Sequence, residues 1–225
     1  MNKNDRVRIL LFFLFWPFIA QALNPAEFTF RRKINFSNYD RVQTLTNFPV
    51  LVRFDPTLTN VYSGMASPTG GDLRFTDAGL INELNFEIDT WNPAGQSFVW
   101  VQVPALSSND CIIAYWGNPT DTNLPAYAVD GSTWSEGFVA VHHLSESNGT
   151  SAGDSTANTL DGNLVNMAGT EWETGNTGNG LRFDGTDDHY TMAHISALFP
   201  ANAATMNVWV KLDVATPVAN NTGFM

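Results

Sequence analysis

The sequence predicts an all-β protein, and three observations support this prediction. Apolar residues recur with period two or in short β-branched runs, and no helical stripe persists over three turns. Clusters of Pro, Gly, Asn and Asp separate these runs at short intervals, as turns between strands do. The chain is 44% hydrophobic and only 15% charged, which indicates a folded core and excludes a disordered acidic tail.

The chain begins with a segment that has the order of a secretory signal peptide. Lys3, Arg6 and Arg8 precede an apolar run over residues 9–19, and Ala20-Gln21-Ala22 has the small-x-small pattern of a cleavage site. The run is about half the ~20 residues that a membrane-spanning helix needs. We therefore expect residues 1–22 to be removed, with an uncleaved anchor as the alternative. The mature protein is then secreted, periplasmic or on the cell surface.

Charge and cysteine content limit the partners and the source of stability. A formal net charge of -11 disfavours binding to nucleic acid or to anionic lipid through the general field of the protein. A single cysteine, Cys111, excludes an intrachain disulfide, so an exported domain must be stabilised by packing. Cys111 opens an apolar run, and this position predicts a buried strand thiol.

Eight segments are predicted as strands. Residues 98–103 carry apolar side chains on both faces, as a strand inside a sandwich does. Residues 205–212 place Met206 and Val208 on one face and Asn207 and Trp209 on the other, which predicts a sheet with one buried face. The predicted strands are residues 48–54, 72–76, 84–89, 98–103, 111–116, 137–144, 181–184 and 205–212.

Residues 117–134 interrupt the strand pattern. They contain Asn118-Pro119, Pro125 and Asp130-Gly131, with few apolar residues in phase. We predict that this segment joins two β-sandwich domains, residues 23–130 and residues 131–225. Residues 145–163 are rich in Ser, Asn, Gly and Thr and predict a long surface loop, an element that often carries binding.

Five blocks in the first half resemble a bacterial extracellular family called domain of unknown function 2341. They are residues 47–52, 71–77, 87–91, 99–104 and 115–119. The resemblance covers residues 28–130 and implies a module of secreted bacterial proteins. Because no activity is established for this family, the resemblance indicates the kind of domain but does not indicate a reaction.

The second half resembles a laminin G-like domain, a concanavalin A-type jelly roll found in lectins and glucanases. The blocks are residues 143–144, 154–156, Asn158, residues 181–188 and residues 206–211. The resemblance implies a domain well longer than residues 131–225, so we expect the jelly roll to be truncated, with unpaired strand edges. The same pair of modules precedes proton-channel proteins of the biopolymer-transport type, where it would face the periplasm.

Acidic and amide side chains in two loops form a candidate calcium site. Calcium binds six to eight oxygen ligands in flexible loops, and the laminin G resemblance implies calcium on the rim of the sandwich. The alternative is turn chemistry, because Asp-Gly and Asn-Gly pairs occur in hairpins whatever they bind. Asp154 and Asp184 are the leading ligands, and the remaining candidates are Asn158, Asp161, Asp187 and Asp188.

Two further motifs are given a structural interpretation. Glu87 and Asp89 alternate on a predicted strand, as the catalytic acids of one class of glucanases do, but Thr90-Trp91 stands where that class has a further Glu. We interpret both as solvent-facing carboxylates and predict that the protein is not an enzyme. His142 and His143 are adjacent and would point to opposite faces of a strand, so we expect His143 to be structural.

Aromatic side chains are the other candidate ligand contacts, because their faces pack well on sugar rings. Trp172 lies between two glutamates in a predicted loop and is the candidate ligand-binding residue. Most of the others are expected in the core: Trp91, Trp100, Trp116, Trp134 and Trp209.

The sequence therefore predicts a non-enzymatic binding module that recognises a glycan or a cell-envelope protein. One alternative is a periplasmic input domain of a biopolymer-transport proton-channel protein or an adhesin. Another is a non-catalytic appendage of a glycoside hydrolase. A membrane would be contacted only through an uncleaved signal or through a region beyond residue 225.

Overall fold

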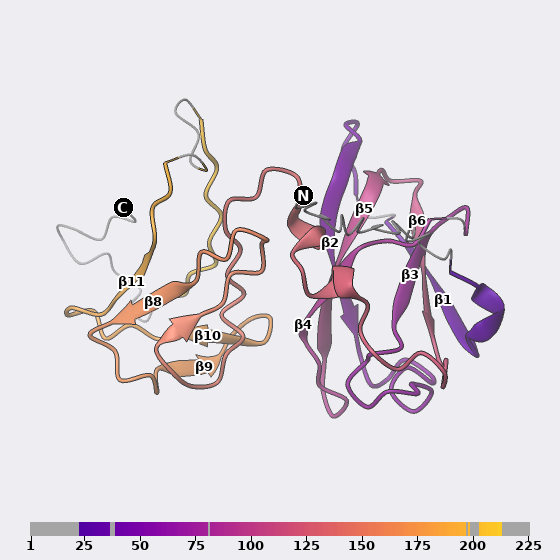
Figure 1. The fold of residues 1–225 in the computed structure, drawn as a ribbon, viewed down its shortest axis with the longest axis horizontal. Coiled ribbons are helices and arrows are strands. Elements are labelled where there is room, and N and C mark those ends of the chain that lie inside the picture. The colour runs from indigo at the N-terminus through magenta and orange to yellow at the C-terminus, as the bar shows by residue number, and fades with distance from the viewer. Residues whose placement is uncertain (1–22, 37–38, 81, 197, 199–202, 213–225) are drawn as a thin grey trace, which may run out of the picture.

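The computed structural model describes residues 23–36, 39–80, 82–196, 198 and 203–212. The regular structure in these residues is all-β apart from short 3-10 helices, the first of them η1 (Pro25–Glu27). Figure 1 shows two lobes side by side, the first built from β1 to β6 and the second containing β8 to β11. None of the helices within the described residues has the length and apolar character needed to cross a membrane. The predicted signal peptide, residues 1–22, lies outside the described residues.

Two antiparallel sheets form the first lobe. One has the order β1 (Phe30–Asn35), β6 (Cys111–Trp116), β3 (Arg74–Asp77), and the other has the order β2 (Leu45–Phe54), β5 (Ser97–Leu106), β4 (Phe86–Thr90). β2 and β5 form a long ladder that pairs Leu45 with Leu106 at one end and Phe54 with Ser97 at the other. The two sheets share one core, which is a sandwich-like arrangement.

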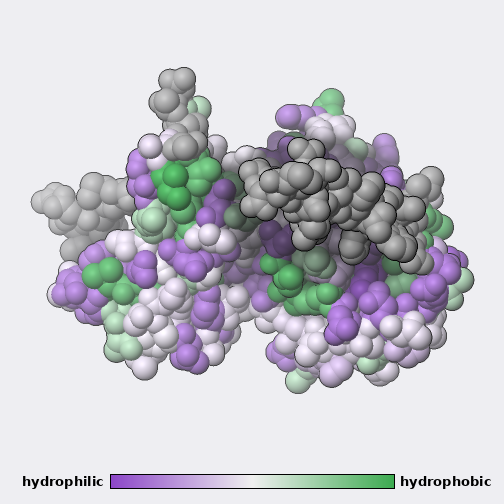
Figure 2. Space-filling model, in the orientation of Figure 1, coloured by the Kyte–Doolittle hydropathy of each residue, from purple (hydrophilic) through white to green (hydrophobic). Residues whose placement is uncertain are grey.

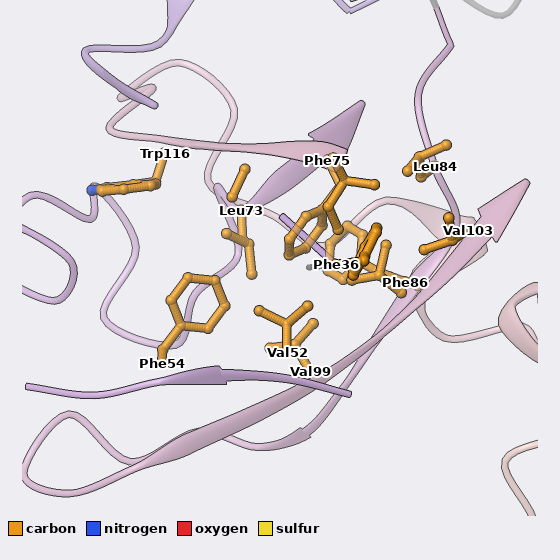
Figure 3. Close-up of a cluster of buried hydrophobic side chains, with 14 of the residues drawn as sticks. Phe36, Val52, Phe54, Leu73, Phe75, Leu84, Phe86, Val99, Val103 and Trp116 are labelled. Carbon is orange, nitrogen blue, oxygen red and sulfur yellow. The ribbon is translucent and has the colours of Figure 1, made fainter. Parts of the chain in front are cut away.

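Alternation along the strands fills this core. In β5, Val99 and Val101 are fully buried, whereas Trp100 between them points to the opposite face of the sheet. Phe75 of β3 meets Phe86 of β4 with ring centroids 5.3 Å apart. Figure 3 shows these two rings among side chains contributed by both sheets. Full burial of each such side chain contributes about 1.5–3 kcal/mol, so this cluster holds the two sheets together.

The five strands predicted in the first lobe are confirmed, with shifts of a few residues at their ends. The prediction for residues 111–116 coincides with β6, and Cys111 is buried there as expected. β1 was not predicted. The charged Arg32 lies on the same inward face as Phe30 and Ile34, so hydrophobic and polar residues do not alternate regularly in this part of the sequence.

Residues 117–134, predicted to join two domains, pack against the first lobe. The helix η2 (Ala126–Ala128) contacts β4, and η3 (Ser132–Trp134) contacts both β4 and β5. Ala128 belongs to the core cluster and Trp134 is buried. Single apolar residues set between turns are thus enough to anchor residues 117–134 to the first lobe. The domain boundary at residue 130 stays a prediction.

The second lobe contains two small antiparallel sheets. One has the order β11 (His189–Met192), β8 (Gly162–Val165), β7 (Ser151–Ala152), and the other pairs β10 (Asn179–Leu181) with β9 (Trp172–Thr174). A complete jelly roll has about eight strands, so these short strands leave the laminin G-like fold a prediction. The strand predicted at residues 181–184 ends at Leu181, because Asp184 accepts a hydrogen bond from the Thr186 N–H and starts a turn.

Two predicted strands of the second lobe are wrong. In residues 137–144, side chains replace a partner strand: the amide group of Asn158 donates to the carbonyl of Val139, and Asp154 accepts from the Val141 N–H. Residues 205–212 alternate in sequence, but no described strand pairs with them. Trp209 in this segment is 86% exposed and does not lie in the core.

The surface has no single large apolar face on the side drawn in Figure 2. That face is mainly hydrophilic, and its hydrophobic residues lie in small separate groups.

Trp116 and Trp134 are buried as predicted, and Trp91 packs against the core cluster.

Candidate functional site

A cavity lies where β4 faces residues 143–159 of the second lobe. Its volume is about 480 Å³, which lies within the range of small-ligand sites, about 300–1,000 Å³. Polar side chains from both lobes line it, and many of them are hydrogen-bond acceptors. The charged lining residues are Glu87, Asp89, Asp130, His143, Glu146 and Asp154.

Three ionisable side chains meet at the wall of this cavity, and we call Glu87, Asp89 and His143 the bridging triad. Glu87 and Asp89 share one face of β4 because alternate strand residues point the same way. His143 lies between them, with Nε2 3.5 Å from Oε2 of Glu87 and Nδ1 3.5 Å from Oδ2 of Asp89. The imidazole ring stacks on Trp100 with centroids 5.7 Å apart. The triad therefore joins β4 of the first lobe to the second lobe.

Further donors hold the two carboxylates of the triad. Trp134 Nε1 donates to Oε2 of Glu87, and Ser155 Oγ donates to Oε1 of Glu87 at 2.6 Å. Trp100 Nε1 donates to Oδ2 of Asp89 at 3.2 Å. The side chain of Asp89 is 1% exposed and that of Glu87 is 21% exposed. The interpretation of both as solvent-facing carboxylates is wrong, because the second lobe and the two indole rings cover this face of β4.

Burial and charge both affect the protonation of the triad. Burial raises the pKa of Asp89 above its usual value, although the His143 charge and the Trp100 hydrogen bond oppose this change. Burial by itself lowers the pKa of His143, but the carboxylates of Glu87, Asp89 and Glu146 outweigh burial and raise that pKa. Both net shifts favour the protonated form, so Asp89 and His143 hold their protons more tightly than the same side chains do in water.

His143 was predicted as a structural strand residue, but it does not lie in a strand. Its side chain is 10% exposed and contacts Trp134 as well as Trp100, with ring centroids 5.4 Å apart in the Trp134 pair. The imidazole packs against both indole rings, which also contact each other, and this packing explains why an extended segment without a strand partner is fixed at this point.

Asp154 lines the cavity, but its oxygens have no room for a cation. Oδ1 accepts from the N–H groups of Val141 and Thr156, and Oδ2 accepts from the Leu160 N–H and the Thr156 hydroxyl. A carboxylate has about four lone-pair positions, and these four donors occupy them. Burial acts to raise the pKa of Asp154, but the hydrogen bonds outweigh it and lower that pKa.

The other predicted calcium ligands are divided between two places. Asp184, Asp187 and Asp188 each offer one carboxylate oxygen, and these oxygens lie within 4.8 Å of one another in the turn before β11. Within the described residues, Asp154 is not part of this group, and the side-chain amide of Asn158 donates to the carbonyls of Phe138 and Val139. Three carboxylate ligands would leave about half of the six to eight positions of calcium to water or carbonyl oxygens. The calcium hypothesis therefore narrows to the turn and stays a prediction.

Trp172, the predicted ligand-binding residue, lies in β9 and does not line the cavity. It is partly buried, and its Nε1 donates to the carbonyl of Gly149 at 2.8 Å.

The sequence predicts neither the cavity nor the triad, because His143 is far from Glu87 along the chain. One sequence signal pointed to the covered face: Trp100 places an apolar ring on the outward side of a strand whose other side fills the core.

These features define an all-β protein with a polar joint between two lobes. Residues 69–136 match the family described as Domain of unknown function (DUF2341). The matched span contains Glu87, Asp89, Trp100 and Trp134 and ends before His143. Comparison with curated proteins and with solved structures gives no match. The first of the two predicted resemblances is thus supported over this span, and the laminin G-like resemblance stays a prediction.

Proposed function

We propose that this chain is a non-enzymatic binding module that acts outside the cytoplasm and recognises a glycan in the cavity between β4 and residues 143–159. The single observation that carries the proposal is a cavity of about 480 Å³ lined by polar groups from both lobes. The incomplete laminin G-like jelly roll is the proposed scaffold of the second lobe. The signal-peptide pattern of residues 1–22 supports the proposed location.

The lining of the cavity suits the hydroxyl groups of a sugar. Carboxylates of Asp130 and Glu146 and hydroxyls of Ser145 and Thr159 lie on its wall. One oxygen of Glu146 accepts from the Gly153 N–H, while Oε2 is buried without a hydrogen-bond partner. A ligand hydroxyl that donates to such a carboxylate forms a charge-assisted hydrogen bond, about twice as strong as a neutral one.

The engagement of the two β4 carboxylates supports binding rather than hydrolysis. Glycoside hydrolysis generally needs two carboxyl groups that both reach the sugar. Asp89 is 1% exposed, and Glu87 accepts hydrogen bonds from Trp134 and Ser155. These side chains serve the joint between the lobes, which supports the proposal that the glycan is bound rather than cleaved.

A protein ligand is the second candidate, and the exposed segment 206–212 favours it. Met206 is 81% exposed, Val208 59% and Trp209 86%. Contiguous exposed apolar side chains often mark a protein interface. This candidate includes an adhesin and the input domain of an envelope biopolymer-transport protein, whereas an appendage of a glycoside hydrolase would bind glycan in the cavity.

Isothermal titration of the purified chain with a panel of bacterial and plant cell-wall oligosaccharides tests the proposal. We expect saturable binding of at least one oligosaccharide without hydrolysis products. Glu146→Ala should abolish it, and Glu173→Ala, an exposed carboxylate in β9, should not. Loss of binding in Trp172→Ala but not in Glu146→Ala would move the site to β9. Failure of every oligosaccharide to bind, or the release of sugars, would contradict the proposal.

A further inference from the structure

The bridging triad places two carboxylates and one imidazole from different lobes at the wall of the cavity, where their side chains are mostly covered by protein. Glu87 and Asp89 belong to β4, and His143 belongs to the segment of residues 138–146 that opens the second lobe. The exposed fractions of the three side chains are 21%, 1% and 10% respectively. With His143 protonated the triad carries one net negative charge, and with His143 neutral it carries two.

We propose that the proton on His143 fastens the second lobe to the first, so that the joint loosens when this proton is lost at higher pH. The proposal goes beyond glycan binding, because it concerns the protein alone and holds whatever ligand occupies the cavity.

The two-sided geometry fits an imidazolium better than a neutral imidazole. Nδ1 faces the carboxylate of Asp89 and Nε2 faces that of Glu87, each at 3.5 Å; Nε2 is buried and forms no hydrogen bond, so its contact with Glu87 is electrostatic. Both ring nitrogens carry hydrogen only in the charged form. A neutral ring would therefore turn a lone pair toward one of the carboxylates, in a place where little water could relieve the repulsion.

The groups around His143 act in one direction. Glu87 and Asp89 face it from β4, and Glu146 faces it from its own segment. The neighbouring elements β5 and η3 contribute the uncharged rings of Trp100 and Trp134. Every charged neighbour named here is a carboxylate, so loss of the proton removes the cation that balances them.

The sign of the linkage follows from the raised pKa of His143. A group whose pKa is higher in the folded state stabilises that state fully below its unfolded pKa, about 6.5 for histidine. The stabilisation is lost as the pH rises through the folded pKa. The raised pKa of Asp89 has the same sign, but its stabilisation is lost as the pH rises from the unfolded pKa of about 3.9 through the folded pKa of that carboxyl, which is a separate transition. The hydrogen bond from Ser155 to Glu87 does not depend on this proton, so we expect the joint to loosen rather than the lobes to part.

NMR titration of the His143 imidazole, combined with hydrogen exchange from pH 5 to 9, tests the proposal on the whole chain. We expect His143 to titrate above 6.5. Over that titration, exchange in residues 138–146, corrected for its intrinsic rate, should rise by up to about tenfold per pH unit, as one linked proton allows. The amides of β2 and β5 should keep their protection at every pH.

Variants separate the proposal from general destabilisation. His143→Gln should exchange rapidly at every pH, without the transition, and His189→Gln, an exposed control, should behave as the wild type. If His143→Gln does not fold, Asp89→Asn replaces it, and both the imidazole titration and the exchange transition should move together to lower pH. The proposal is overturned if His143 titrates at or below 6.5. It is also overturned if exchange in residues 138–146 does not follow that titration.

Discussion

Asp154→Asn is the sharpest test of how the loop of the second lobe is built. In the structure, Asp154 ties residues 138–160 together through hydrogen bonds to Val141, Thr156 and Leu160. The substitution keeps the shape of the side chain but replaces one acceptor oxygen by an amide donor. If that amide faces the Leu160 N–H, two donors meet and one buried hydrogen bond is lost.

The expected cost can be worked out from these bonds. Leu160 is 3% exposed, and a buried N–H without an acceptor costs about 1–3 kcal/mol. The bonds from Val141 and Thr156 persist but lose their charge assistance, which removes roughly 0.5–1 kcal/mol in all, since charged hydrogen bonds are about twice as strong as neutral ones. We therefore expect a total loss of about 1.5–4 kcal/mol in the stability of the second lobe.

Hydrogen exchange of residues 141, 156 and 160, together with thermal unfolding, measures this loss. Because the pKa of Asp154 is lowered, its stabilisation is complete above the unfolded pKa, about 3.9, and is lost as the pH falls through the folded pKa. The wild type should accordingly show an acid transition in this loop that Asp154→Asn lacks. A loss below ~0.5 kcal/mol, the usual scale of a surface substitution, would refute the reasoning. So would a calcium-dependent stability that vanishes in the variant, because Asp154 would then be a metal ligand.

Three further outcomes are expected. Arg74→Met should cost about 1–3 kcal/mol in urea unfolding, because the buried Arg74 guanidinium donates to the carbonyls of Gly71 and Leu73; a cost near zero would contradict this role. Trp209→Ser should change the free energy of unfolding by less than ~0.5 kcal/mol, and a larger loss would indicate that Trp209 packs in the core. Millimolar calcium should shift the NMR signals of Asp184 and Asp187 in the wild type and not in Asp184→Asn; unchanged wild-type spectra would end the calcium hypothesis.

The first lobe could be predicted because its strands are long and their faces differ. Val99 and Val101 alternate with Trp100 along β5; the two valines are buried in the core, whereas Trp100, which was expected there, lies on the other face and stacks on His143. The second lobe gave weaker signals, since β7 has two residues and carries no readable period. Residues 137–144 do alternate, but the backbone is satisfied by Asn158 and Asp154 in place of a strand. Alternation alone does not reveal which donor will be the partner.

The site could not be predicted from the sequence, because it depends on contacts between segments that are far apart along the chain. Glu87 and Asp89 were recognised as a pair on one face, but their burial follows from His143 and the indole rings, which arrive from other parts of the chain. Asp154 was predicted as a calcium ligand because it lies in a loop with other oxygen-bearing side chains, but backbone N–H groups seek the same lone pairs of a carboxylate as cations do. Only the positions of the Val141 and Leu160 N–H groups distinguish the two roles.

A double-mutant cycle between Glu87 and His143 tests the joint between the lobes most directly. Glu87→Gln, His143→Gln and the double variant are compared with the wild type by the free energy of opening of residues 138–146, measured by hydrogen exchange below pH 6. The structure places the two side chains 3.5 Å apart, and side chains in such contact couple by about 0.5–3 kcal/mol. We predict a favourable coupling within this range that fades above the titration of His143. Additive effects at low pH would contradict the joint on which this account rests.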